Sequence, residues 1–230
     1  MSSIAIITAR GGSKRIPRKN IKEFCGLPII AYSIKAALDS KIFDEVMVST
    51  DDEEIASIAK KYGAKVPFLR SAKNSDDFAT TADVLKEVLD EYKKMGKEFD
   101  YLACIYPTAP FVTANKISEA FSILSNSDAG SIMTVTKYSF PPQRSLVIRN
   151  GVIKYQYPEY AKARSQDLEP IFHDCGQFYI CRTDAFIKDG SVITNKTMGY
   201  EISEEEVQDI DNISDWNIAE VKYKTIHNKV

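Results

Sequence analysis

The residues best suited to chemistry lie within the first twenty positions of the chain. After the apolar run 4–7, the segment 9–20 contains paired glycines, a serine and a cluster of cationic side chains, namely Arg10, Lys14, Arg15, Arg18 and Lys19. Paired glycines let backbone N–H groups approach a ligand, and clustered Arg and Lys side chains require an anion. Neither common glycine-rich phosphate motif is present. A solvated basic loop is the alternative, but we favour a polyphosphate site because α/β folds place ligands at strand ends.

A second candidate site is Asp209-Ile210-Asp211, where two carboxylates alternate around an apolar residue. In an extended segment the side chains at i and i+2 share a face, so both acids would point the same way. Such a pair suits Mg²⁺, which takes its remaining ligands from water and substrate phosphates. The alternative is a turn with exposed acids. Together with a polyphosphate loop, metal binding becomes the favoured interpretation.

A third group lies in and beside the segment 137–172, and comprises Arg144, Arg164, Gln166, His173 and Asp174. The arginines could bind a carboxylate through bidentate contacts. Surface charge and interface packing explain them equally well. For His173 beside Asp174, we favour a hydrogen-bonding role over a catalytic dyad, because no serine or cysteine elbow motif lies nearby.

Strand-like and helix-like segments alternate through most of the chain, which predicts a Rossmann-like, mostly parallel sheet with helices on both faces. Thr50 or Asp51 is expected to cap a helix, and a ligand role for Asp51 is less favoured. The alternation stops in 137–172, a segment too long for a plain connection, with a hairpin turn expected at Asn150-Gly151. After the opening strand, the expected strands are 45–49, 65–69, 101–106, 129–136, 176–181, 198–202 and 207–209, and the expected helices are 28–40, 51–62, 82–94, one around 117–124 and one after 211.

The composition is that of an ordinary globular protein. The 230 residues are 44% hydrophobic and 27% charged, and the formal net charge of -2 gives no support for nucleic acid as a partner. We expect one domain, 1–230, with 137–172 as an excursion. Four scattered cysteines match neither a zinc site nor a disulfide framework, and neither a signal peptide nor a membrane span is recognisable. A cytoplasmic protein without a membrane partner is therefore expected.

Taken together, these motifs resemble the acylneuraminate cytidylyltransferases, the CMP-sialic acid synthetase family. The resemblance begins at segment 9–20 and continues through Ser49-Thr50-Asp51, 107–110 and 209–211. Segments 157–160, 164–168 and 173–179 are most similar to the pseudaminic acid cytidylyltransferases, which serve bacterial surface and flagellar glycosylation.

The resemblance implies a nucleotidyltransferase fold of the nucleotide-diphospho-sugar type that works as a homodimer, in which the excursion reaches the neighbouring subunit and helps bind the sugar. It implies CTP as co-substrate and Mg²⁺ held by Asp209 and Asp211, with Arg10 and Lys19 completing the catalytic set. The CTP-binding residues would be Ala9, Arg10, Gly11, Gly12, Ser13, Lys14, Asn20, Arg70, Thr81 and Tyr106. The sugar-binding residues would be Arg144, Arg164, Gln166, His173 and Gln177.

Three positions depart from the family pattern. Tyr106 replaces a glutamine that commonly reads cytosine, so base recognition would rest on backbone groups. Thr8 replaces a proline, and Asp174-Cys175-Gly176 replaces an Asn-Gly pair, which argues against N-acetylneuraminate as the substrate.

The expected reaction is transfer of CMP from CTP to the anomeric hydroxyl of a nonulosonic acid, pseudaminic acid first, with release of pyrophosphate. The alternatives are a CMP-N-acetylneuraminate, CMP-legionaminate or eight-carbon ulosonate synthetase. From a different class, a non-catalytic nucleotide sensor would use the same pocket only to bind. Retention of Lys19, Asp209 and Asp211 argues against the sensor.

Overall fold

A six-stranded sheet forms the centre of the molecule. The structure is a computed structural model and describes residues 1–227. The strand order is β10-β6-β9-β5-β1-β4, and only β9 runs antiparallel to its neighbours. The mostly parallel α/β sheet predicted from the sequence is thereby confirmed. The strands are β1 Ser3–Thr8, β4 Glu45–Ser49, β5 Tyr101–Ile105, β6 Ser131–Lys137, β9 Phe172–Arg182 and β10 Thr197–Glu201.

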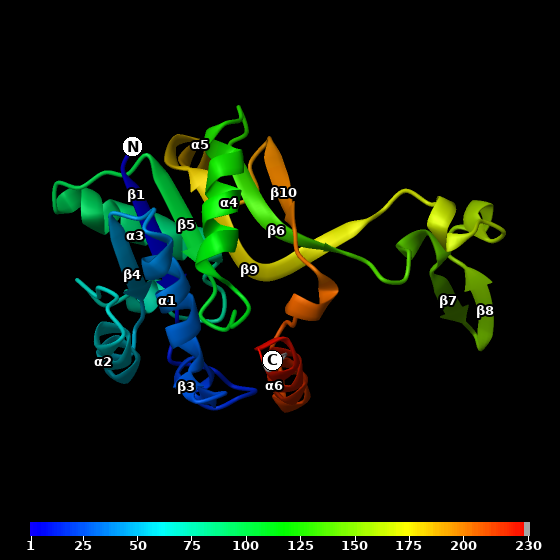
Figure 1. The fold of residues 1–230 in the computed structure, drawn as a ribbon, viewed down its shortest axis with the longest axis horizontal. Coiled ribbons are helices and arrows are strands. Elements are labelled where there is room, and N and C mark those ends of the chain that lie inside the picture. Colours follow the sequence, from blue (N-terminus) through cyan, green and yellow to red (C-terminus); the bar gives the residue numbers. More distant parts are fainter. Residues whose placement is uncertain (228–230) are drawn as a thin grey trace.

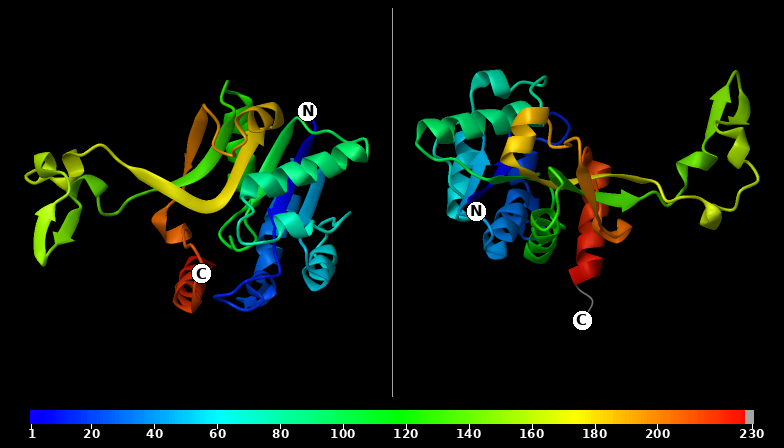
Figure 2. Two further views of the ribbon diagram at one scale, coloured as in Figure 1. Left: turned by 180° about the vertical axis from the view of Figure 1, so that it is seen from behind. Right: turned by 90° about the horizontal axis from the view of Figure 1, so that it is seen from above.

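Helices cover both faces of this sheet (Figures 1 and 2). Side chains of α1, α2 and α4 belong to the core cluster on one face, whereas those of α3 and α5 belong to the cluster on the other. A last helix, α6, packs beside the cationic loop through a third cluster that contains Trp216 and Phe24. The bounds are α1 Ile29–Ser40, α2 Glu53–Lys61, α3 Thr81–Lys94, α4 Ala114–Ser125, α5 Thr183–Asp189 and α6 Ile213–His227.

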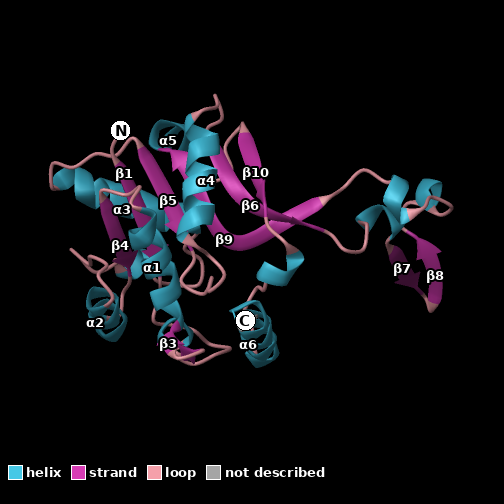
Figure 3. Cartoon of the chain, viewed as in Figure 1, coloured by secondary structure: helices cyan, strands magenta, loops and turns pink. Residues whose placement is uncertain are grey.

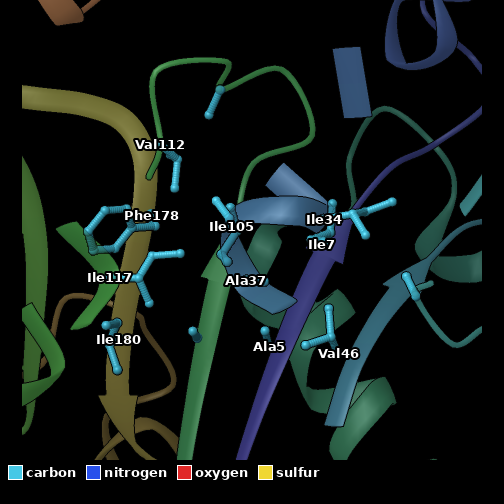
Figure 4. Close-up of a cluster of buried hydrophobic side chains, with 14 of the residues drawn as sticks. Ala5, Ile7, Ile34, Ala37, Val46, Ile105, Val112, Ile117, Phe178 and Ile180 are labelled. Atoms are coloured by element: carbon cyan, nitrogen blue, oxygen red, sulfur yellow. The ribbon is translucent and has the colours of Figure 1, made fainter. Parts of the chain in front are cut away.

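The apolar run of β1 is buried on both sides, as expected for a central parallel strand. Ala5 and Ile7 face the cluster under α1 and α4, where Ile34 and Ile117 join them (Figure 4). Ile4 and Ile6 face the α3 cluster. Because successive side chains of a strand alternate between faces, this one strand contributes to both cores and fixes where its last residue, Thr8, lies.

The segment between β6 and β9 extends away from the sheet (Figures 1 and 3). It contains the hairpin of β7 Leu146–Arg149 and β8 Val152–Tyr155, whose turn is Asn150-Gly151 as expected, with φ angles of 53° and 76°. Positive φ at both turn residues is the type I′ geometry that suits a two-residue hairpin. Short 3₁₀ turns complete the segment: η3 Pro142–Arg144, η4 Pro158–Tyr160 and η5 Ser165–Asp167.

Two predicted strands are wrong. Segment 65–69 makes only a single bridge, between Lys65 and Met47, because the chain then passes Pro67 and leaves the edge of the sheet. Segment 207–209 is irregular and follows a 3₁₀ turn, η6 Glu204–Glu206, that is held by side chains rather than by a neighbouring strand. The remaining short elements are η1 Lys19–Ile21, η2 Ala72–Asn74, β2 Glu23–Phe24 and β3 Leu27–Pro28.

All four cysteines are free thiols. Across residues 1–227 we find no helix with the length and apolar character that crossing a bilayer requires.

Candidate active site

A polar pocket lies where the cationic loop meets the segment that follows β5. It measures about 360 Å³ and opens at the carboxyl ends of β1 and β5, the edge where α/β sheets bind ligands. Four of the five loop cations contribute to its wall. The lining residues are Thr8, Arg10, Ser13, Lys14, Arg15, Lys19, Asn20, Tyr106, Pro107, Thr108 and Asp211.

The remaining loop cation, Arg18, turns away from the pocket and fastens the loop to α2. Its guanidinium contacts both oxygens of Asp52, at 2.5 and 2.8 Å, and Glu54 at 2.5 Å. The Arg18 guanidinium holds the pKa of Asp52 at about 2. Asp52 also caps α2 by accepting from Ile55 N at 3.0 Å, so the expected cap at Thr50 or Asp51 is wrong by one or two positions.

The backbone of the loop also lies against this helix end. Gly11 N donates to Asp51 Oδ1 at 2.8 Å. A Cβ at Gly11 would lie 2.8 Å from Asp52 Oδ2, whereas one at Gly12 would enter open space. The close approach therefore requires glycine at position 11. Ala9 is fully buried beneath the loop.

Two side chains hold the loop from within. Asn20 is buried, and its Nδ2 donates to Arg10 O at 2.8 Å. Lys19 spans the pocket to the far end of the chain, where its Nζ donates to Ile210 O at 2.6 Å. Burial lowers the pKa of Lys19, against the opposite influence of Asp211 and Asp209. The loop and the acidic pair are thus brought together by the fold.

The acidic pair flanks a buried anchor. Ile210 is 1% exposed and packs in the third core cluster with Ile16 and Trp216. Asp211 lines the pocket, where its carboxylate pairs with Arg15 at 2.7 Å. Its backbone N–H donates to Asp215 Oδ2 at 2.9 Å. Asp209 is exposed.

A magnesium ion beside a nucleotide makes modest demands on protein ligands. Among residues 1–227 no group of three or more His, Cys, Asp or Glu side chains could hold a metal ion. An all-protein cage is not what Mg²⁺ uses beside a nucleotide, because one or two carboxylates and the substrate phosphates suffice. Asp209 and Asp211, at the edge of a cationic pocket, fit that arrangement.

The sequence analysis missed Asp77. Its carboxylate pairs with Arg10 at 2.9 Å and with Lys14, and Arg10 also donates to Asp76 O at 3.1 Å. Hydrogen bonds from Lys14 and Arg10 lower the pKa of Asp77. An acid here was visible only as part of the polar stretch before α3, and nothing local linked it to a loop more than sixty positions earlier.

The nucleotide-binding candidates outside the loop are Tyr106 and Thr81, which lie together, and Arg70, which lies at the end of β4. Tyr106 lines the pocket, and its hydroxyl lies 3.3 Å from Thr81 Oγ1. Arg70 is buried at the end of β4, where its guanidinium donates to Ser49 O at 2.6 Å and to Ser49 Oγ at 3.0 Å. Burial lowers the pKa of Arg70.

The sugar-binding candidates of the excursion lie apart from the pocket within one chain (Figure 1). Arg144 donates to Ser165 Oγ at 3.0 Å, and Arg164 pairs with Asp167 at 2.6 Å. Gln166 is exposed. Arg144 borders a separate recess that also contains Tyr155 and Phe140.

The remaining two candidates lie on β9. His173 Nδ1 is 2.9 Å from Asp174 O, while the Asp174 carboxylate accepts from Tyr179 Oη and, at 2.8 Å, from Gly176 N. His173 and Asp174 therefore do not form the side-chain bond of a dyad. Gln177 is 3% exposed and donates from Nε2 to Glu206 O at 2.7 Å.

Comparison with solved structures finds the same α/β fold over the whole chain. The chain superposes with a TM-score of 0.70 on a CMP:2-keto-3-deoxy-manno-octonic acid synthetase complexed with CTP, over 99% of this chain and 100% of that one. At 16% identity this likeness concerns the fold.

The sequence comparisons are more specific. The cytidylyltransferase family model matches residues 4–206. A pseudaminic acid cytidylyltransferase of Campylobacter jejuni is 38% identical over 228 residues, covering 99% of this chain and 98% of the relative. A CMP-N,N'-diacetyllegionaminic acid synthase of Legionella pneumophila is 36% identical over 233 residues, covering 96% of this chain and 95% of the relative. The chain belongs to the cytidylyltransferase family.

Proposed function

We propose that this protein transfers CMP from CTP to the anomeric hydroxyl of pseudaminic acid and releases pyrophosphate. The observation that carries the proposal is the pocket at the sheet edge, in which four cations of the glycine-rich loop face Asp211. A nonulosonic acid acceptor is supported by the 38% and 36% identical relatives, whose names specify pseudaminic and legionaminic acids.

In this proposal the loop binds the triphosphate. Arg10, Lys14, Arg15 and Lys19 bring four positive charges to the pocket. Asp77 now pairs with Arg10 and Lys14. Binding of the more highly charged triphosphate would displace it.

The oxygen of the acceptor hydroxyl attacks the α-phosphorus in line and its proton passes to solvent. The bond from the α-phosphorus to the oxygen shared with the β-phosphate breaks, and pyrophosphate leaves. Catalysis of such transfers rests on positioning and on stabilising the charge that develops on the phosphate oxygens. Lys19, fixed by its bond to Ile210 O, and Arg10 would supply that charge from the protein. Mg²⁺ held by Asp209 and Asp211 would add positive charge at the same oxygens when bound.

We further propose that the protein is a homodimer whose excursion contacts the second copy. Its hairpin exposes apolar side chains, with Ile148 71% and Ile153 60% exposed. Isolated two-stranded hairpins are only marginally stable, so this one requires a partner surface. A second copy could also bring Arg144 and Arg164 to a sugar near the pocket.

Four free thiols suit a reducing compartment, so the cytoplasm stays our expected location.

The deciding experiment measures pyrophosphate release from CTP with purified pseudaminic, legionaminic and N-acetylneuraminic acids. Release with pseudaminic acid alone, or at the highest kcat/KM, is expected. Preference for another acid would overturn the assignment of the sugar, and tight CTP binding without release from any acid would identify a sensor. Asp209→Asn should reduce turnover at least a hundredfold, whereas Asp39→Asn, at an exposed position of α1, should leave it unchanged.

A further inference from the structure

The acidic pair lies on a segment that the sheet itself does not hold. After β10, residues 202–212 contain the single 3₁₀ turn η6 and make no strand pairing. The last ladder-like contact is Ile202 N to Val135 O at 2.8 Å. The position of Asp209 and Asp211 must therefore depend on side chains that reach η6 from other elements.

Gln177, on β9, is one of these side chains. It is almost fully buried, and its Nε2 donates to the backbone carbonyl of Glu206 at 2.7 Å. Among the described residues its Oε1 has no hydrogen-bond partner. The one described hydrogen bond of this buried amide goes to η6, so the Gln177 side chain holds that turn in place. It also exposes too little surface to contact a ligand.

Lys116, on α4, binds the same residue from the other side. Its Nζ donates to Glu206 Oε1 at 2.7 Å and to Phe111 O at 2.9 Å, and its side chain is 14% exposed. Glu206 is thus fixed by its backbone to β9 and by its carboxylate to α4. It precedes Asp209 by three positions.

We propose that Gln177 and Lys116 are positioning residues for the acidic pair. They fix the start of the segment at Glu206, while Lys19 and the buried Ile210 fix its end. Asp209 lies between these two fixed points and Asp211 directly follows the second, so both acids keep a constant spacing to the pocket. This inference rests on the proposed magnesium site. It also assigns Gln177 a role other than the sugar contact expected from the sequence.

The experiment uses Mn²⁺ as the probe and the variants Gln177→Met and Lys116→Met, which keep all or most of the side-chain length and lose the hydrogen bonds. Binding is measured by electron paramagnetic resonance of free Mn²⁺, with protein and a non-hydrolysable CTP analogue at equal concentration. Lys86→Met, at an exposed position of α3, is the matched control. Thermal unfolding and the KM for the sugar acid are recorded for every variant.

Each variant should raise the Mn²⁺ dissociation constant about tenfold or more, the usual effect of losing an outer-shell contact, while the sugar KM at saturating metal stays unchanged. Unchanged Mn²⁺ binding in both variants, with a raised sugar KM in Gln177→Met, would overturn the positioning role. Should Gln177→Met fail to fold, Lys116→Met tests the same claim from α4. If Asp209→Asn binds Mn²⁺ as well as the wild type, both the metal site and the positioning role are refuted. If Mn²⁺ binding is lost in Asp209→Asn but unchanged in Gln177→Met and Lys116→Met, only the positioning role is refuted.

Discussion

The contact between Arg18 and Asp52 offers the sharpest quantitative test of how the nucleotide loop is held. Asp52 performs two functions, because it caps α2 through Ile55 N and pairs with Arg18 at 2.5 and 2.8 Å. Replacing it by asparagine keeps a good capping residue and removes the charge. Replacing it by alanine removes both. The two variants therefore separate the ion pair from the cap.

The magnitude follows from the lowered pKa of Asp52. Its pKa is about 2 in the folded protein, against an ordinary value of 3.8, mainly because of the hydrogen bond from Arg18. This difference corresponds to about 2 kcal/mol of stability at neutral pH, and the Asp52 side chain is 22% exposed. Asp52→Asn should lower the free energy of unfolding by about 2 kcal/mol, and Asp52→Ala by about 1 kcal/mol more for the lost cap.

The dependence on pH identifies the cause. A carboxylate whose pKa is lower in the folded state stabilises the protein above its unfolded pKa, and the stabilisation is lost as the pH falls through the folded pKa. The gap between wild type and Asp52→Asn should therefore shrink by about half between pH 7 and pH 3. The extra loss in Asp52→Ala should not change with pH, because the cap of an alanine variant is missing at every pH.

The assays are urea unfolding and thermal unfolding, both followed by circular dichroism at several pH values. At pH 7 the melting temperature of Asp52→Asn should fall by about 4–8 °C. Asp39→Asn, exposed on α1, changes the net charge equally and serves as control. A stability gap that is the same at pH 7 and pH 3, or one that Asp39→Asn reproduces, would refute the argument that the ion pair holds the loop.

Three further predictions concern ligand binding and assembly. Gly11→Ala should raise the KM for CTP at least tenfold, because the new Cβ would lie 2.8 Å from Asp52 Oδ2, whereas Gly12→Ala should change it little; equal effects in initial-rate kinetics would contradict this. Asp77→Asn should lower the dissociation constant for CTP several-fold, since the carboxylate that competes for Arg10 and Lys14 is lost. Calorimetric titration with CTP measures this constant, and weaker binding by the variant would refute the competition. The double variant Ile148→Asp with Ile153→Asp should be monomeric in analytical ultracentrifugation where the wild type is a dimer, because both apolar side chains are exposed on the hairpin. A monomeric wild type, or a variant that stays dimeric, would contradict the proposed dimer interface.

Much of the scaffold follows from local patterns. The run 4–7 is apolar at every position, which is the pattern of a strand buried on both faces. The hairpin turn at Asn150-Gly151 follows from two residues that tolerate positive φ. The strand expected at 65–69 had apolar residues as well, but a strand needs a neighbour along its whole length, and only Lys65 has one.

The cationic loop and the acidic pair were each recognisable as candidates from residue types alone, because paired glycines, clustered cations and alternating acids are local signals. Their meeting was not, since Lys19 and Ile210 are separated by 191 positions and no local rule relates them. The tertiary structure also divided the loop cations, turning Arg18 toward Asp52 and leaving Arg10, Lys14, Arg15 and Lys19 at the pocket. It alone placed Asp77 on Arg10 and fixed Glu206 between β9 and α4. Hydrophobic periodicity and turn chemistry act over a few residues, whereas the partners of these charged side chains come from distant parts of the chain and are brought together only by tertiary packing.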